Sequence, residues 1–128
     1  MNNNTIKEFT DLNAWKESHN LVIITYKITS KFPLKETYSL VDQMRRAAAS
    51  ITSNIAEGFG RRTYKEKIQF YYLAQGSLTE LKNQVIISKD VGYLDLNKYN
   101  LLTNQANTAH KLLQGLITKS KSFLNHKS

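Results

Sequence analysis

Apolar residues recur at three- and four-residue spacing along most of this chain, a pattern that is typical of amphipathic α-helices. No run alternates strictly between apolar and polar residues, so the pattern does not predict strands. Four segments carry the helical pattern, at about residues 13–31, 36–57, 64–91 and 97–124. Because the connections between them are short, we predict an all-α fold, an up-down-up-down antiparallel four-helix bundle in which residues 1–128 form a single domain.

Local signals predict where these helices begin and end. Phe32-Pro33 follows the first helix, and proline disfavours helical backbone in the residue before it. Thr63 and Glu66 have the spacing of a capping box, in which two free backbone amides at the start of a helix are bonded by side chains. Gly92 suits the end of the third helix.

The second segment, which contains QMRRAAASITSNIAEGFGRR, has an unusual mixture of small and polar residues. Its alanines allow a neighbouring helix to approach closely. Arg46, Asn54 and Glu57 stand among apolar neighbours, and a polar group buried without a hydrogen bond costs about 1–3 kcal/mol. We therefore expect a structural polar network of these three residues with Glu80 of the third segment. Arg46 has two candidate partners, Asp42 one turn earlier and Glu80.

The third segment carries more apolar surface than one helix contact needs. Its inward stripe is predicted to consist of Phe70, Ala74, Leu78, Leu81 and Val85. Other apolar residues then belong either to a wide core face or to a second face that packs against another subunit: Tyr64, Ile68, Tyr71 and Tyr72, together with Ile86, Ile87 and Val91. Gly76, in mid-helix, is expected to allow close approach to residues 47–50.

Composition narrows the class of protein. A chain of 128 residues with 41% hydrophobic residues suits one globular domain. It has no cysteine, no apolar run of 18 residues and no apolar signal-peptide core near its start. We expect a cytoplasmic protein without membrane segments, disulfides or thiolate–metal sites.

Charge points to a polyanionic partner. The chain holds 18 Lys and Arg residues against 10 Asp and Glu residues, a formal net charge of +8. From residue 97 onward it has five lysines and no acidic residue. Antiparallel helices would bring residues 61–67 to the same end as the last residues, together with Lys7 and Lys127. The predicted nucleic-acid-binding residues are Arg61, Arg62, Lys65, Lys67, Lys119 and Lys121. For the pair Arg61 and Arg62 the alternative is that they are solvated charges of a loop.

Motifs of enzymes and metal proteins are missing from the sequence. The histidines, His19, His110 and His126, are scattered, and no Glu-x-x-His pair or Cys/His cluster occurs. Gly58-Phe59-Gly60 follows a helix and lacks the lysine spacing of a phosphate-binding loop. We expect no catalytic residues, no metal and no cofactor, and therefore no enzymatic activity.

Several motifs together resemble a known bacterial family. They are Leu12-x-x-Trp15, Phe32-Pro33-x-x-Glu36-x-Tyr38-x-Leu40, Gln43-x-x-Arg46-Ala47-Ala48-x-Ser50-Ile51-x-x-Asn54-Ile55-Ala56-Glu57-Gly58 and Ala74-x-Gly76-Ser77-Leu78-x-Glu80-Leu81. In this order they resemble the four-helix bundle proteins first noticed as reading frames within intervening sequences of 23S ribosomal RNA genes.

The resemblance implies a homopentamer of four-helix bundles. It also implies kinship with the accessory variability protein of diversity-generating retroelements, a basic pentamer that binds nucleic acid and a reverse transcriptase. No catalytic residue is carried over, and the matches at Arg46, Asn54, Glu57 and Glu80 are expected to mark internal contacts and assembly. We expect a non-enzymatic homo-oligomer that binds RNA or DNA; the alternative is a protein-interaction scaffold, for example for a reverse transcriptase.

Overall fold

Four long helices make up most of the computed structural model, which describes residues 5–126. They are α1 (Asn13–Thr29), α2 (Leu40–Phe59), α3 (Tyr64–Asp90) and α4 (Leu96–His126), with short 3-10 helices η1 (Phe9–Asp11) and η2 (Leu34–Glu36). Helix α2 packs against α1 and α3, and α4 packs against the same two helices. Residues 5–126 contain no strand, so the chain is all-α, as predicted from the apolar spacing.

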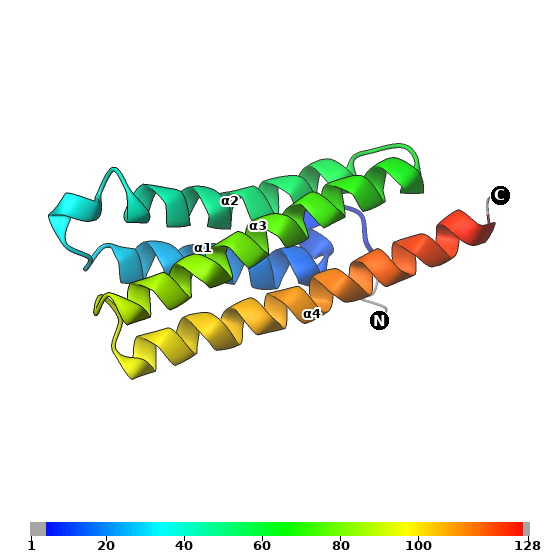
Figure 1. The fold of residues 1–128 in the computed structure, drawn as a ribbon. Coiled ribbons are helices and arrows are strands. Elements are labelled where there is room, and N and C mark those ends of the chain that lie inside the picture. Colours follow the sequence, from blue (N-terminus) through cyan, green and yellow to red (C-terminus); the bar gives the residue numbers. More distant parts are fainter. Residues whose placement is uncertain (1–4, 127–128) are drawn as a thin grey trace.

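The connections lie at two ends of the molecule (Figure 1). The connections α1–α2 and α3–α4 share one end, where the hydroxyl of Tyr93 donates a hydrogen bond to Glu36 Oε2 at 2.7 Å. The α2–α3 connection lies at the other end, beside the last turns of α4.

Side-chain hydrogen bonds and one glycine mark three of the helix boundaries. Half of the predicted capping box forms: Glu66 N donates to Thr63 Oγ1 at 3.1 Å, whereas the Glu66 carboxylate accepts from the Thr63 hydroxyl at 2.9 Å and not from a backbone amide. Helix α2 begins at Leu40, later than the expected residue 36, because Glu36 belongs to η2 and accepts hydrogen bonds from Ser39 and from the backbone of Leu40. Gly92, after α3, has a φ of 89°, a backbone conformation that favours glycine.

A single hydrophobic core lies between the four helices. Leu21, Met44, Leu78 and Leu113, one from each helix, are completely buried. Burial of side chains of this size stabilises the folded state by about 1.5–3 kcal/mol each relative to exposure. The core is therefore large enough to hold the four helices together.

One predicted core position is wrong by one residue. Phe70 is only half-buried, and Tyr71 is in the core with 2% of its surface exposed. Gly58 explains the difference, because a Cβ atom at that position would lie 2.8 Å from Cε1 of Tyr71 and 2.9 Å from Cβ of Phe70. The missing side chain in α2 leaves the space that the Tyr71 ring occupies.

Gly76 does not have the predicted close contact within the chain. It is exposed, and no atom outside its two neighbours and the backbone of the adjacent helix turns lies within 4 Å of the position that its Cβ would take. The small residues Ala48 of α2 and Ala74 of α3 are both completely buried in the core. Between α2 and α3 the hydroxyls of Ser50 and Ser77 are 2.9 Å apart.

The predicted polar network of Arg46, Asn54, Glu57 and Glu80 is not formed within residues 5–126. Arg46 pairs with Asp42, with 2.9 Å between Nε and Oδ2, and its side chain is 79% exposed. A pair one turn apart on one helix needs no partner from another helix, which accounts for the choice of Asp42. Glu80 is exposed and accepts a hydrogen bond from Gln84 at 3.5 Å.

The other two members of the expected network also have local partners. Asn54 Nδ2 lies 2.9 Å from the carbonyl oxygen of Ser50 and 3.1 Å from its hydroxyl. Glu57 Oε2 lies 3.7 Å from Arg61. Only the Asn54–Ser50 pair extends to another helix, through the Ser50–Ser77 contact.

Arg45 makes the contact between helices that was expected of Arg46. Its Nε donates to Thr29 Oγ1 at 3.0 Å, and its Nη2 donates to the carbonyl oxygen of Tyr26 at 3.3 Å. The guanidinium carbon lies 4.6 Å from the centre of the Tyr26 ring. Arg45 thus bonds the last turn of α1, as an additional donor to the carbonyl oxygen that also accepts from the Ser30 N–H.

Candidate nucleic-acid interface

The rings of Tyr64 and Phe123 lie 5.0 Å apart, centre to centre, at an angle of 35°. Tyr64 begins α3, and Phe123 lies near the end of α4, so two segments that are distant in the sequence meet at one end of the molecule (Figure 1). The six predicted binding residues belong to these segments. We call this the basic end, comprising Arg61, Arg62, Lys65, Lys67, Lys119 and Lys121.

Most of the cations at the basic end are open to solvent. Arg61, Arg62, Lys65, Lys119 and Lys121 are exposed. Of these five residues, only Arg61 has an ion pair in the described part of the chain, a weak contact with Glu57 at 3.7 Å. The expected additional residue Lys7 is exposed as well, whereas Lys127 lies outside the described residues.

Lys67 differs from the other five. Its Nζ donates a hydrogen bond to the carbonyl oxygen of Phe59, the last residue of α2, at 2.5 Å. Partial burial lowers the pKa of Lys67. This side chain closes the end of α2, and its ammonium group is already bonded within the protein.

Aromatic rings accompany the cations. Arg61 lies over the Phe70 ring at 4.5 Å, and Lys121 lies over the Tyr72 ring at 5.0 Å. Lys67 lies 5.3 Å from the centre of the Phe59 ring. Cations over ring faces are attracted by the electrons of the ring, which holds the charges beside flat apolar surfaces.

A cavity of about 250 Å³ opens beside these residues. Its lining includes Phe59, Tyr64, Lys67, Tyr71, Lys119 and Phe123. Burial, with a smaller effect of Tyr64, raises the pKa of Tyr71 to about 12, so its hydroxyl stays neutral at physiological pH. We call this the aromatic cavity.

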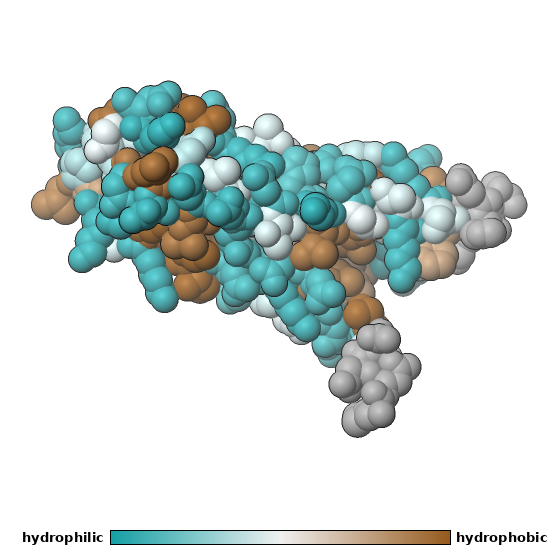
Figure 2. Space-filling view, turned by 90° about the horizontal axis from the view of Figure 1, so that it is seen from below, coloured by the Kyte–Doolittle hydropathy of each residue, from teal (hydrophilic) through white to brown (hydrophobic). Residues whose placement is uncertain are grey.

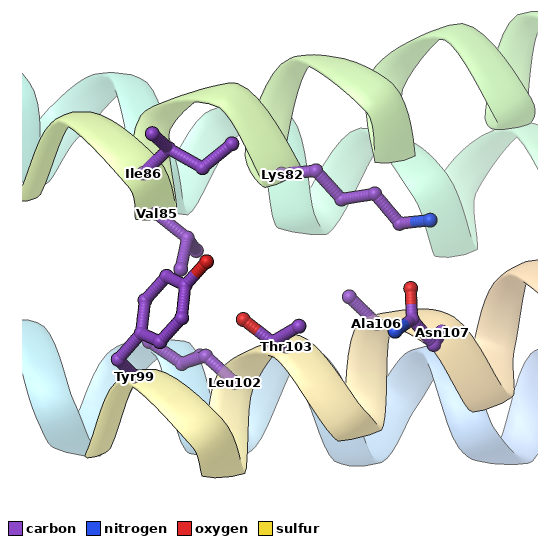
Figure 3. A pocket seen from close by; sticks show the side chains of 8 residues that line it. All are labelled: Lys82, Val85, Ile86, Tyr99, Leu102, Thr103, Ala106 and Asn107. Carbon is purple, nitrogen blue, oxygen red and sulfur yellow. The ribbon is translucent and has the colours of Figure 1, made fainter. Parts of the chain in front are cut away.

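A second, smaller cavity of about 110 Å³ lies between α3 and α4 (Figure 3). Val85, Ile86 and Leu102 form much of its wall, and the side chain of Lys82 extends along its edge. Lys82 Nζ lies 2.7 Å from Nδ1 of His110. Burial and the charge of Lys82 lower the pKa of His110, so the imidazole is neutral and accepts this hydrogen bond.

Neither cavity has the residues of a metal or hydrolytic site. His19 stacks on Trp15 with 4.7 Å between ring centres, away from His110, and the side chain of His126 lies outside the described part. No group of three His, Cys, Asp or Glu residues in the described part of the chain is placed to hold a metal ion. In the same part, no helix is both long and apolar enough to cross a membrane.

The aromatic residues of the basic end were not predicted as part of the site. Their helical spacing indicated a core or a subunit contact, although Phe59, Phe70 and Tyr72 flank the basic run in the sequence. The alternation of rings and cations over residues 59–72 was the available signal. This alternation indicates a binding surface only once the structure shows that Phe123 packs against Tyr64.

The family model described as 23S rRNA-intervening sequence protein matches residues 10–115. The chain belongs to this family. The match includes α1, α2 and α3 in full and contains Arg61, Arg62, Lys65 and Lys67. Lys119, Lys121 and Phe123, in the last turns of α4, lie beyond it, so the 23S rRNA-intervening sequence family model includes four of the six residues of the basic end.

A solved structure from Bacteroides thetaiotaomicron has a similar fold. It is described as a protein with unknown function from the S23 ribosomal protein family. It is 19% identical to this chain, with a TM-score of 0.73 over 81% of this chain and 97% of the other. No curated protein sequence matches this member of the 23S rRNA-intervening sequence family.

Proposed function

We propose that this chain is a non-enzymatic, homo-oligomeric four-helix bundle that binds RNA or DNA through phosphate contacts at its basic end. The contact between Tyr64 and Phe123 is the observation that carries the proposal, because it unites the basic run at residues 61–67 with the acid-free α4. Four of the cations, Arg62, Lys65, Lys119 and Lys121, have no ion pair among the described residues.

Phosphate contacts of this kind do not read sequence. They release counterions from the nucleic acid, so affinity falls steeply with salt concentration. The net charge of +8 also favours association with any polyanion at low ionic strength. We expect sequence-tolerant binding in the micromolar range.

We further propose an up-down-up-down bundle that assembles as a homopentamer. Contacts of α1 with α2, α2 with α3, α3 with α4 and α1 with α4 suit this connectivity. The family resemblance implies the pentamer, and a ring would present five basic ends.

Exposed apolar side chains around the α3–α4 connection, which we call its apolar surface, support assembly. In the last turns of α3, at the connection and in the first turns of α4, 41–64% of the surface of these residues is exposed: Ile86, Ile87, Val91, Leu96 and Leu101. Figure 2 shows apolar residues gathered toward the same end of the molecule, on a face that is otherwise mostly hydrophilic. This apolar surface lies at the end opposite the α2–α3 connection, so subunit contacts there would leave the basic end free.

The same surface favours the second candidate function, a protein-interaction scaffold. Its partner would be another protein, such as a reverse transcriptase, and the positive charge would then serve solubility and steering. Binding measurements with nucleic acid separate the two functions.

The test uses labelled RNA and DNA at several salt concentrations, with the double variant Arg61→Ala/Arg62→Ala. Loss of two phosphate contacts should reduce the slope of log affinity against log salt by about 1.4–1.8. The matched control is Lys31→Ala/Lys35→Ala, which removes two exposed charges near η2, at the other end. An unchanged slope in the arginine variant would remove this pair from the site, and absence of binding at low salt would leave only the scaffold.

The oligomeric state is measured independently by light scattering. A pentamer has about five times the subunit mass of 14.7 kDa. A particle of 14.7 kDa at working concentration would contradict the pentamer.

A further inference from the structure

The aromatic cavity lies among the cations of the basic end, a position that phosphate binding alone does not require. Lys119 and Lys67 line it together with the rings of Phe59, Tyr64 and Phe123. We infer that the basic end binds single-stranded nucleic acid, and that one unpaired base of the strand enters the aromatic cavity. This inference rests on the proposed function and specifies its ligand.

Stacking surfaces favour a single strand over a duplex. In a duplex the bases are stacked on one another and only phosphates and sugars reach a cationic surface, so rings would add little. Proteins that bind single strands combine cations with aromatic rings on which unpaired bases stack. The pair Tyr64–Phe123 and the volume of about 250 Å³ provide both a stacking surface and space for a planar ring system.

The polar groups that line the cavity indicate how such a base would be bound. The hydroxyl of Ser120 donates to the carbonyl oxygen of Leu116 at 2.7 Å, and the ammonium group of Lys67 is bonded to Phe59. These two groups are therefore already engaged, which leaves the tyrosine hydroxyls and Lys119 as the other polar side-chain groups of the lining that could contact a base. The cavity would accept different bases with similar affinity, which agrees with sequence-tolerant phosphate contacts.

Lys119 has a different position in this arrangement. It is exposed and lines the cavity without an ion pair in the described part of the chain. An ammonium group at this place can bind the phosphate next to an inserted base. Arg61 and Lys121, each lying over a ring, extend the surface for neighbouring nucleotides.

The test compares a labelled single-stranded oligonucleotide with the duplex of the same sequence, using the variants Phe123→Ala and Tyr64→Leu. Loss of one stacked base should weaken single-strand binding by about 5- to 140-fold and leave duplex binding within about twofold. Tyr38→Leu is the control, because Tyr38 is 94% exposed and lies beside η2, at the other end. Circular dichroism of each variant checks that the helices are intact.

A photocrosslink locates the base directly. A single strand containing 5-iodouridine, irradiated with the wild-type protein, should attach to peptides that contain Tyr64 or Phe123. Crosslinks only to other peptides would overturn the inference, even if single strands bind well.

The outcomes separate this inference from the proposed function. If Arg61→Ala/Arg62→Ala lowers the salt slope while Phe123→Ala leaves single-strand binding unchanged, the inference of an inserted base is wrong and the proposed phosphate site is supported. If Phe123→Ala loses affinity equally for the single strand and for the duplex, the inference of an inserted base is also wrong. If neither nucleic acid binds at low salt, both proposals fail.

Discussion

The ammonium group of Lys67 lies 2.5 Å from the carbonyl oxygen of Phe59, so a side chain of α3 bonds the last residue of α2. Carbonyl oxygens at the end of a helix have no partner in the helix, and a positive charge there is favourable. Lys67 therefore helps to fix the turn that carries Arg61 and Arg62. Its role differs from that of the exposed lysines around it.

Replacing Lys67 with Met should lower the free energy of unfolding by about 1–2 kcal/mol, because a charged hydrogen bond to a helix end is lost. Its effect on the salt dependence of nucleic-acid binding should be smaller than that of Lys65→Met. Denaturant unfolding and binding titrations of both variants provide the measurements. A stable Lys67→Met protein that has lost binding would reverse these roles.

Gly58→Ala tests the close contact between α2 and α3. Alanine favours the helix by up to about 1 kcal/mol, but its Cβ would lie 2.8 Å from the buried Tyr71 ring, and overpacking costs about 1–3 kcal/mol. We expect a net loss of about 1–2 kcal/mol in the free energy of unfolding, measured in denaturant. No loss would show that the ring moves freely.

Gly76→Ala is the matched substitution at an open position. No atom of another helix lies within 4 Å of its Cβ position, so the subunit fold should be retained, with a gain of up to about 1 kcal/mol from helix propensity. If the exposed side of α3 packs closely in an oligomer, light scattering should show weaker assembly. A fully assembled variant would mean that Gly76 is not at a subunit contact.

The sequence predicts the helices well because amphipathic spacing depends mainly on residues of the same helix. The sequence predicts the contacts between helices less well, since periodicity indicates which face of a helix is apolar but not which side chains of another helix pack against that face. The spacing predicted Phe70 in the core, but Tyr71 lies there. The space that Tyr71 occupies is left by Gly58 and depends on how α2 and α3 cross, which the spacing within one helix does not reveal. Arg45 and Arg46 are adjacent, and only the position of α1 decides which of them contacts another helix.

The sequence predicts the charged residues of the candidate site but not its aromatic residues. Net charge and the acid-free end of the chain required only counting along the sequence. The contact of Tyr64 with Phe123 depends on how α3 and α4 are aligned over their full lengths. Small errors in that alignment would separate the two rings, so spacing alone does not predict the aromatic cavity.

The two arginines provide a matched pair of stability variants. Arg45→Met removes two hydrogen bonds to α1 and should lower the free energy of unfolding by about 1–2 kcal/mol. Arg46→Met removes an exposed pair with Asp42 and should cost about 0.5 kcal/mol or less. Equal values for the two variants, measured in denaturant, would contradict the assignment of Arg45 as the helix-joining residue.

His110 predicts a pH dependence of stability. Its pKa is lowered in the folded protein from the ordinary value of 6.5, so the unfolded chain binds a proton more readily. The contribution of His110 to the free energy of unfolding is fully present above pH 6.5 and is lost as the pH falls below this value. The melting temperature of wild type should therefore drop between pH 7.5 and 5.5, and His110→Asn, which keeps an acceptor for Lys82, should show a smaller drop. An identical drop in the variant would exclude His110 as the cause.

Ser120 is the last residue of α4 with a buried side chain in the described part of the chain, and side chains 121–124 are exposed. The final turns are held mainly by the stacking of Phe123 on Tyr64 and of Lys121 on Tyr72, so opening them costs little free energy. Their backbone amides should exchange hydrogen with deuterated solvent sooner than those of the buried turns. A ligand that covers Phe123 would slow this exchange, and the C-terminal turns would then report occupancy without any label.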